Sequence, residues 1–508
     1  MKPVDQSEDA LQMRAVARAS FALGASWISV VFFMWPGKWA LPAGAVSSVS
    51  FFMAQLVLPR CRFSTKQFIT PLNWMLLAFG SQLILMPALV RLAGPSIFPL
   101  PSLTSEKAIN FALFLITASF WAFCIAVHAF RRSSRSQLQL ATADESWIPG
   151  RGLAFIFIIV GLAGVSMAFG TFDRLIEYLT NPVVFMLYAA EAATRSATLA
   201  EAAGTFLKPF LGFGFLLLWC RAIDLPLRQG EKHRWFGRVF LIAMIAISYA
   251  LMTYNRGAFA VPMVAMIAVL SKRLPKKSMR YLFAAGAIFA ALLGAVTLYK
   301  SAVHSNSSGT IDKDFLTTAA GYIDVMGTVQ LYGQAPQYLG YFVERNHYGS
   351  SPTAGTTLVA SVMNPVPILG KPFRSHSGVY LYNLILGRNP ENPDQIPQLT
   401  GELFLDFNIF GILLGFGTAG WAIARLQSRF DASRSALEVY IVLFASIWMG
   451  FLTVGSIDVI AQIALYSSLP IYVFLFYKKR RQGHLVPQKR LLMLRVVVDR
   501  SSSFEGAV

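Results

Sequence analysis

The sequence predicts an all-α polytopic membrane protein. Of its 508 residues, 55% are hydrophobic and only 14% are charged, which is too apolar for a soluble protein with a normal wetted surface. The apolar residues lie in long runs such as "FALFLITASFWAFCIAVHAF" (111–130). Helices are expected because backbone groups in lipid must be paired internally, and barrel strands would give alternating segments of about ten residues.

A bilayer core of roughly 30 Å requires about 20 predominantly apolar residues per helix. About twelve runs of that kind, flanked by charge or by Pro and Gly, are predicted to span. Their approximate limits are 17–36, 39–58, 68–90, 108–130, 152–170, 205–222, 238–254, 257–271, 281–299, 401–424, 435–455 and 459–477.

Basic residues set the expected orientation, because Lys and Arg beside spans are retained in the cytoplasm. With residues 1–16 inside, the alternate connections include "PRCRFSTK", "RRSSRSQ", "SKRLPKKSMR" and "KKRRQGH", and about 31 of the 44 basic residues then lie inside. We therefore expect a multi-pass membrane protein with both termini cytosolic. The tail, 478–508, begins with a cationic cluster that suits anionic lipid headgroups or a stop-transfer flank.

Three other features limit the class of protein. The first residues, "MKPVDQSEDALQMR", lack the apolar core and cleavage site of a removable signal peptide, so the first span is expected to stay as an anchor. The basic excess does not predict nucleic-acid binding, because the cations are spread between apolar runs rather than gathered on one soluble face. Three cysteines, none in an outer segment, predict no extracytoplasmic disulfide.

Two outer segments are longer than the other connections. Residues 171–204, within the region of spans 1–9 (17–299), mix apolar and charged residues too evenly to span, and suit a helix lying at the membrane interface. Residues 300–400 form a large periplasmic loop before the last three spans, 401–477. Its many aromatic and aliphatic residues predict that this loop is partly helical and folded against the membrane domain.

Known nucleotide and metal motifs are absent from the sequence. No glycine-rich phosphate loop follows a predicted strand, and neither HExxH nor His/Cys metal spacing occurs. We therefore expect no cofactor and no metal.

The outer side instead carries arginines that oppose the orientation rule: Arg256 in the hairpin "TYNRGAFA", and Arg345, Arg374 and Arg388 in the large loop. Two histidines accompany them, His347 in "ERNHYG" and His376 in "FRSHSG". Arginine presents a planar fork of donors suited to phosphate oxygens, and a nearby histidine can take a proton near neutral pH. Together these residues suit a reaction on a phosphate-linked lipid at the outer leaflet.

Simpler explanations exist for several of these residues. Arg256 fits a hairpin tip whose charge reaches water, with Asn255 and Gly257 forming the turn. Arg345 and Arg388 fit solvated loop charges, and His376 fits a structural loop residue.

Glu402 and Asp406 lie four residues apart at the start of the tenth span, "GELFLDFNIFGILLGFG". In a helix they share one face near the outer surface, and carboxylates at that depth are candidate functional groups. Thr400 as a cap, with Glu402 at the helix dipole, explains Glu402 without a functional role but explains Asp406 poorly.

These stretches carry a resemblance to a known family. The "NRGAFA" hairpin, the large outer loop with "RSHSGVYLYNLIL", and "GELFLDFNIFGILLG" resemble the bacterial O-antigen polymerase and ligase group, and Wzy-type repeat-unit polymerases in particular. The likeness covers roughly residues 240–425. The Arg-x10-Gly spacing described for some such polymerases is not met.

The resemblance implies a membrane glycosyltransferase of GT-C-like architecture that makes O-antigen, as in lipopolysaccharide biosynthesis, or an exopolysaccharide. A glycan on undecaprenyl diphosphate would be transferred to the terminal sugar of another lipid-linked repeat unit. By that analogy Arg256, Arg345 and Arg374 would hold the diphosphate, with Arg388 and His347 as further substrate-binding residues. His376, Glu402 or Asp406 would act in catalysis. The expected partners are the lipid-linked oligosaccharide and membrane lipid, and a chain-length regulator protein is left open.

Other classes of membrane protein are alternatives. A ligase, with lipid A core as acceptor, is not separated from a polymerase by these residues. A lipid-linked oligosaccharide flippase or another transporter would also have about twelve spans, but should show paired halves and broken helices. A dolichol-type glycosyltransferase is disfavoured because the first outer loop is only "WPGK".

Overall fold

The computed structural model describes the chain as a set of helices. It covers residues 41–63, 69–96, 104–141, 150–170, 199–225, 232–252, 256–273, 325–349, 352–366, 369–387 and 396–480, together with Gly24, Trp27, Ile28, Val31, Leu175 and Ile176. No strand occurs in these ranges. The predicted all-α class is therefore confirmed for the part of the chain that the structure describes.

The helices outside the large loop run from α2 to α21. They are α2 (Pro42–Val57), η2 (Pro59–Cys61), α3 (Pro71–Gly80), η3 (Ser81–Leu85), α4 (Met86–Ala93), α5 (Glu106–Ala141), α6 (Arg151–Phe169), α9 (Leu199–Leu207), α10 (Pro209–Asp224), α11 (Lys232–Met252), α12 (Arg256–Arg273), α19 (Leu399–Ala432), α20 (Ala436–Phe451) and α21 (Ile457–Leu465). Those within the predicted loop 300–400 are α15 (Val325–Tyr332), α16 (Pro336–Arg345), η5 (His347–Gly349), α17 (Thr356–Met363), η6 (Lys371–His376) and α18 (Gly378–Ile385).

Several helices are long and apolar enough to cross a membrane, which is compatible with a polytopic membrane protein. Five in the described ranges meet this test, or six if a bent pair counts as one span. The five are Pro71–Ala93, Glu106–Arg131, Arg151–Phe169, Ala203–Asp224 and Leu399–Ala432. Shorter apolar helices are Pro42–Val57, Gly237–Tyr249 and Ala436–Phe451.

The twelve predicted spans are matched in part. The predicted spans 17–36 and 281–299 lie largely or wholly outside the described residues, and each of the others overlaps a described helix. The predicted span 459–477 is not one straight helix, because Ile457–Leu465 and Leu469–Arg480 are bent by 53° at a short break. The chain turns there at Tyr466, Ser467 and Ser468, where neither helix continues.

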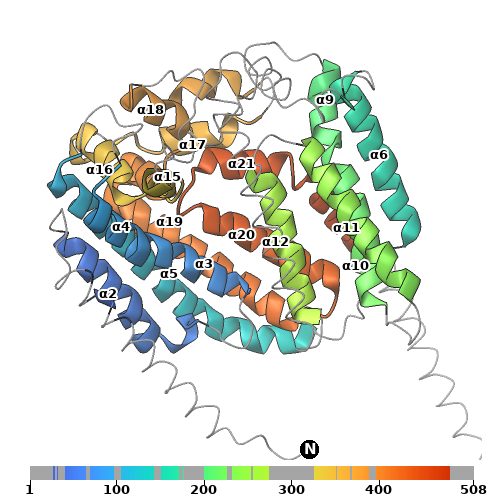
Figure 1. The fold of residues 1–508 in the computed structure, drawn as a ribbon, viewed down its shortest axis with the longest axis horizontal. Helices are drawn as coiled ribbons and strands as arrows, with labels where there is room; N and C mark the ends of the chain where they lie inside the picture. Colours follow the sequence, from blue (N-terminus) through green and yellow to red (C-terminus); the bar gives the residue numbers. More distant parts are fainter. Residues whose placement is uncertain are drawn as a thin grey trace, which may run out of the picture.

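The helices form two hydrophobic clusters. One joins α2–α5 to α16, α18 and α19, and the other joins α6 and α10–α12 to α20 and α21. Figure 1 shows α5 and α19 side by side. These two helices belong to the first cluster, and the green helices α10–α12 belong to the second. Glycines allow this packing: a Cβ on Gly420 of α19 would collide with the carbonyl of Phe123 in α5. α5 and α19 therefore form the central pair that carries the loop.

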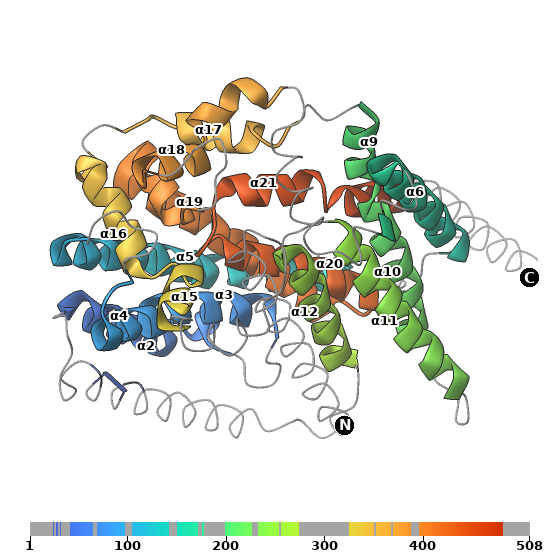
Figure 2. The ribbon, with the colours of Figure 1, turned by 45° about the horizontal axis from the view of Figure 1, so that its top comes forward.

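In Figure 2, α16 lies beside the start of α5, and α17 and α18 lie near the start of α19, whereas α15 lies lower, against α4. Ser105 N donates to the Glu344 carboxylate (3.2 Å) and Thr104 Oγ1 to the Gln337 carbonyl (3.1 Å), so α16 is fixed to the start of α5. Gln330 Nε2 likewise donates to the Gly94 carbonyl (2.9 Å). These contacts join segments that the alternation of spans predicts on the outer side.

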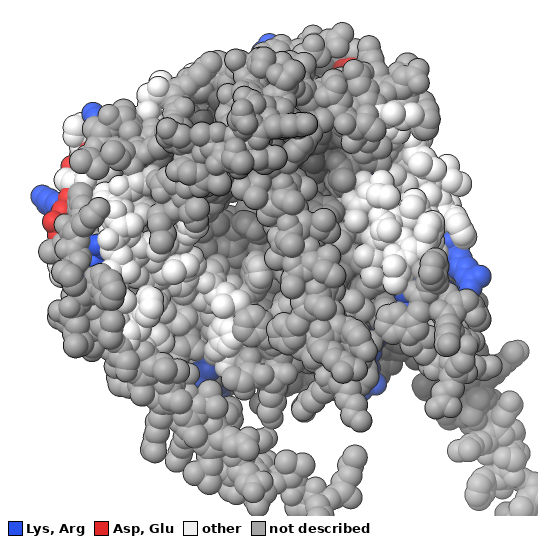
Figure 3. Space-filling model, viewed as in Figure 1, with Lys and Arg blue, Asp and Glu red and all other residues white. Residues whose placement is uncertain are grey.

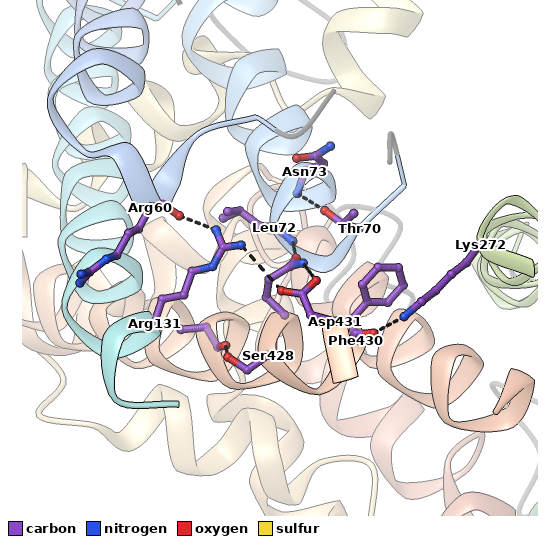
Figure 4. A network of polar contacts seen from close by, with 11 residues as sticks. Arg60, Thr70, Leu72, Asn73, Arg131, Lys272, Ser428, Phe430 and Asp431 are labelled. Atoms are coloured by element: carbon purple, nitrogen blue, oxygen red, sulfur yellow. Dashed lines mark hydrogen bonds and ion pairs between the residues drawn. The ribbon is translucent and has the colours of Figure 1, made fainter. Parts of the chain in front are cut away.

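Segments predicted on the inner side meet at the other end of α19 (Figure 4). Arg131 donates to the Arg60 carbonyl (2.7 Å) and lies 3.8 Å from Asp431. Lys272 donates to the carbonyl of Phe430. Four connections that are far apart in the sequence therefore share one side, as the predicted alternation of spans requires.

Charged side chains are unevenly placed on the described surface. On the face in Figure 3, blue and red atoms lie toward the rim, and the white surface between them is uncharged. Large side chains such as Ile159 on α6, Phe114 on α5 and Phe410 on α19 are exposed on the long helices. Exposed apolar side chains in this number suit contact with lipid chains.

Candidate functional site

A break in α19 connects the loop to the membrane helices. Asn408 has φ 55° and ψ −147°, which no helix contains, so the segment from Leu399 to Phe407 is separate from the longer helix that follows. The Leu405 and Asp406 carbonyls are freed from helical pairing and accept from Thr353 N and Ala354 N, both at 3.1 Å. The backbone of the loop is thereby attached to the start of the tenth predicted span.

Asp406 holds the first turn of α17. Its buried carboxylate accepts from Thr357 N (3.2 Å), from Leu358 N (2.8 Å) and from the Thr353 hydroxyl. These N–H groups belong to a helix N-terminus, where an anion is favoured by both hydrogen bonding and the helix dipole. Because all three donors belong to α17 or the turn before it, the geometry favours a structural role for Asp406.

Glu402 lies one turn earlier on the same face, as the spacing predicts. Its side chain is buried, Ile457 N donates to Oε2 (2.8 Å), and the Ser361 hydroxyl donates to Oε1 (3.4 Å). Ser361 in turn accepts from Gly378 N (2.9 Å). Among the described residues no Lys or Arg forms an ion pair with Glu402. Glu402 therefore joins α17, α18 and α21 at one point.

Asp458 is a second buried carboxylate in this region, and the sequence did not predict it as a site residue. It lies in the first turn of α21, where Asn364 Nδ2 donates to Oδ1 (3.0 Å). The residue is 6% exposed. The signal was an acid one residue after the start of an apolar helix, in "GSIDVIAQ", with Ser456 as the cap.

The η6 turn places basic side chains on the surface next to Glu402 and Asp458. Lys371, Arg374 and His376 are all exposed, and the Ser375 hydroxyl lies 3.1 Å from Nδ1 of His376. The turn ends at Ser377, whose hydroxyl accepts from Tyr380 N (3.3 Å) and so caps α18. His376 stands two residues before Gly378, which lies against Glu402.

The nearby phenol of Tyr382 is unsuited to take a proton. It is buried in α18 against Phe342, and burial raises its pKa. His376, unlike Tyr382, is exposed, so it is the better placed of the two to accept a proton from a bound molecule.

Arg345 and His347 lie in a second region, at the end of α16. Both are exposed, and the Arg345 guanidinium lies 5.2 Å from the Tyr341 ring centre. His347 lines an open groove of about 530 Å³ together with Phe404 and Asn408. Phe404 lies between Glu402 and Asp406 in the sequence, so the same short helical segment borders the groove.

Two predicted site residues are not placed by their side chains. Arg256 is the first residue of α12, the residues of the predicted turn before it lie outside the described ranges, and nothing is described of its side chain. Arg388 lies outside the described residues.

A metal centre finds no support in the described ranges, because no group of three or more His, Cys, Asp or Glu could hold an ion there. The three cysteines are buried and free, with Cys61 and Cys124 only 3.2 Å apart at sulfur.

The arrangement can bind anions and transfer protons at the Leu399 end of α19. Cations and a histidine lie on an exposed turn, and that turn rests on buried carboxylates that fix its backbone. Comparison with known proteins adds no assignment: no protein-family model, no curated protein and no solved structure matches this chain.

Proposed function

We propose that the protein is a bacterial polysaccharide polymerase that joins undecaprenyl-diphosphate-linked oligosaccharide repeat units at the periplasmic face of the inner membrane. An acceptor hydroxyl oxygen would attack the anomeric carbon that links the donor glycan to its diphosphate. The bond from that carbon to the phosphate oxygen breaks, and its electron pair leaves with undecaprenyl diphosphate. The acceptor proton passes to a base on the protein.

One observation carries this proposal: the exposed cationic turn η6 rests, through Gly378 and Ser361, on the buried carboxylate of Glu402 at the start of a membrane-type helix. A lipid diphosphate at the membrane surface needs positive charge at that depth. A hydroxyl acceptor needs a base beside it. The η6 turn offers both in Arg374 and His376.

Within this proposal, His376 is the base and Glu402 is a positioning residue. His376 is exposed and can meet a substrate, whereas Glu402 is 1% exposed and touches the backbone of the turn instead. Arg374 would hold the departing diphosphate, because a guanidinium binds two phosphate oxygens at once. The family resemblance alone assigns Arg256 and Arg345 to binding of the same diphosphate and Arg388 to binding of the substrate.

The test is incubation of the purified, detergent-solubilised protein with a synthetic undecaprenyl-diphosphate repeat unit. EDTA is present and nucleotide sugar is left out, and product length is read by mass spectrometry. We expect a ladder of multiples. His376→Gln should lower the rate by about 10²–10⁴-fold, the usual value of a positioned base. Arg434→Ala, an exposed arginine at the other end of α19, is the matched control and should leave the rate unchanged.

The outcomes separate the rival functions. Transfer to lipid A core without a ladder would support a ligase. Unchanged substrate from folded protein would favour a transporter, a class that uses broken helices such as the bent pair after Ser456. Sealed vesicles with a fluorescent lipid-linked glycan would then be the next measurement.

A further inference from the structure

The groove beside α16 is built almost entirely of aromatic and aliphatic side chains. Its volume is about 530 Å³, and it is open on one side. Phe111 and Phe114 of α5, Phe404 of α19 and Tyr348 of η5 form its walls. The Phe111 ring lies edge-on to both Tyr348 (5.4 Å between centroids) and Phe404 (5.8 Å). These rings come from three separated segments and meet only in the fold.

The backbone of the segment that carries Tyr348 has an unfavourable conformation. His347, Tyr348 and Gly349 have φ of 47°, 56° and 79°, three left-handed residues in succession. Only glycine adopts that conformation without cost, and each of the others is strained by about 1–2 kcal/mol. Asn408 across the groove adds a further outlier with φ 55°. Strain of this kind is retained where the surroundings fix it, and it clusters at sites that clamp ligands.

One polar atom faces this wall without a partner. A Cβ on Gly349 would collide with Oδ1 of Asn408, so the two segments are in direct contact. Asn408 Oδ1 is buried and accepts no hydrogen bond.

The groove borders the lipid-facing surface. Phe114, which lines it, is 57% exposed. Phe410 and Leu414, just beyond the break in α19, are 77% and 75% exposed. Phe114 lies eight residues into α5, about 12 Å from the start of the helix. A hydrocarbon chain in the outer leaflet can therefore reach the groove from the side.

The opposite end of the groove carries charge. Lys107 Nζ lies 5.5 Å from the Tyr348 ring centre, His347 lines the groove and is exposed, and Arg345 is exposed nearby in the chain. Two acids share this end. Glu106 is exposed, and the Glu344 carboxylate is engaged by Ser105 N.

We propose that this groove binds a polyisoprenoid chain that ends in a phosphate or diphosphate. The branched, unsaturated chain packs on the aromatic wall from Phe114 to Tyr348, and the anionic end meets Lys107 and His347. A sugar ring is the less suitable occupant, because the lining offers polar side-chain groups only at His347, Tyr348 and Asn408, and a sugar needs many hydrogen bonds. The assignment to undecaprenyl diphosphate in the cell rests on the proposed function.

The experiment measures binding and needs no turnover. Purified protein in detergent is titrated with farnesyl diphosphate, a soluble polyisoprenoid, and the dissociation constant is read by calorimetry. Farnesol and inorganic diphosphate are titrated separately to divide the contributions of chain and charge. We expect saturable binding of farnesyl diphosphate, and weaker binding of each fragment.

A matched pair of variants locates the site. Phe114→Ala should weaken binding about tenfold. Phe410→Ala removes an exposed phenylalanine just outside the groove and should leave the dissociation constant unchanged. His347→Ala should weaken farnesyl diphosphate but not farnesol. Each side chain removed is exposed, so loss of folding is not expected and is checked by gel filtration.

Several results would overturn the groove proposal: no binding by the unchanged protein, equal losses in Phe114→Ala and Phe410→Ala, or displacement of the probe by a soluble glycan repeat unit. The proposed function fails independently, if no ladder forms from folded protein that still binds farnesyl diphosphate.

Discussion

Gly378 lies directly against the carboxylate of Glu402. A Cβ atom on Gly378 would fall closer to Oε1 of Glu402 than any van der Waals contact allows. The same glycine donates its N–H to Ser361, which donates to the same carboxylate oxygen. The turn that carries His376 is therefore seated on Glu402 by both shape and hydrogen bonding.

Gly378→Ala tests this relationship. The added methyl must push Glu402 or the η6 turn aside, so we expect loss of glycan polymerisation and a cost of about 1–3 kcal/mol in stability. Polymerisation is measured as product length, and stability as thermal unfolding in detergent. Gly417→Ala is the control, because a Cβ there meets nothing within 4 Å and alanine favours the helix. Full activity of Gly378→Ala would show that the seating does not matter.

Asp406→Ala tests whether the other buried carboxylate has a structural or a catalytic role. The change leaves Thr357 N and Leu358 N without their acceptor, so we expect a loss of about 1–3 kcal/mol in stability. Asp431→Ala removes a half-exposed carboxylate at the far end of α19 and should cost less than about 1 kcal/mol. Unchanged thermal unfolding combined with lost activity would instead return Asp406 to the catalytic group.

Arg256→Lys tests whether the predicted hairpin arginine binds diphosphate. Lysine keeps the charge but loses the planar fork of donors, so we expect activity well below that of the unchanged protein. The measurement is polymerisation rate at matched protein level in membranes. If Arg256→Ala is fully active, the residue lies outside the site.

Cysteine labelling tests the orientation. The three native cysteines are buried, so a membrane-impermeant maleimide should react only with introduced ones. Leu369→Cys, at a position 63% exposed beside η6, should be labelled from outside the inner membrane. Arg434→Cys, exposed after α19, should be labelled only after the membrane is opened. The reverse pattern would place the loop in the cytosol and remove the proposed function.

The helical class and most helix positions could be predicted from the sequence, because apolar run length is a local property that a bilayer selects. The shared face of Glu402 and Asp406 followed in the same way from helical spacing. The break at Asn408 could not be predicted. Its cause is that the Leu405 and Asp406 carbonyls pair with Thr353 and Ala354, more than 40 residues away in the chain.

The sequence by itself determined that arginines, histidines and aromatic residues gather in segment 300–400, which is predicted to lie on the outer side. It did not determine which of them meet. Ile457 and Ser361 joined Glu402, and Phe111 joined Tyr348, through packing of segments distant in the chain. Such contacts depend on how rigid helices fit together, which composition and periodicity do not encode. Only the tertiary structure therefore decided that the turn carrying His376 rests, through Gly378 and Ser361, on a buried carboxylate and that His347 borders an apolar groove.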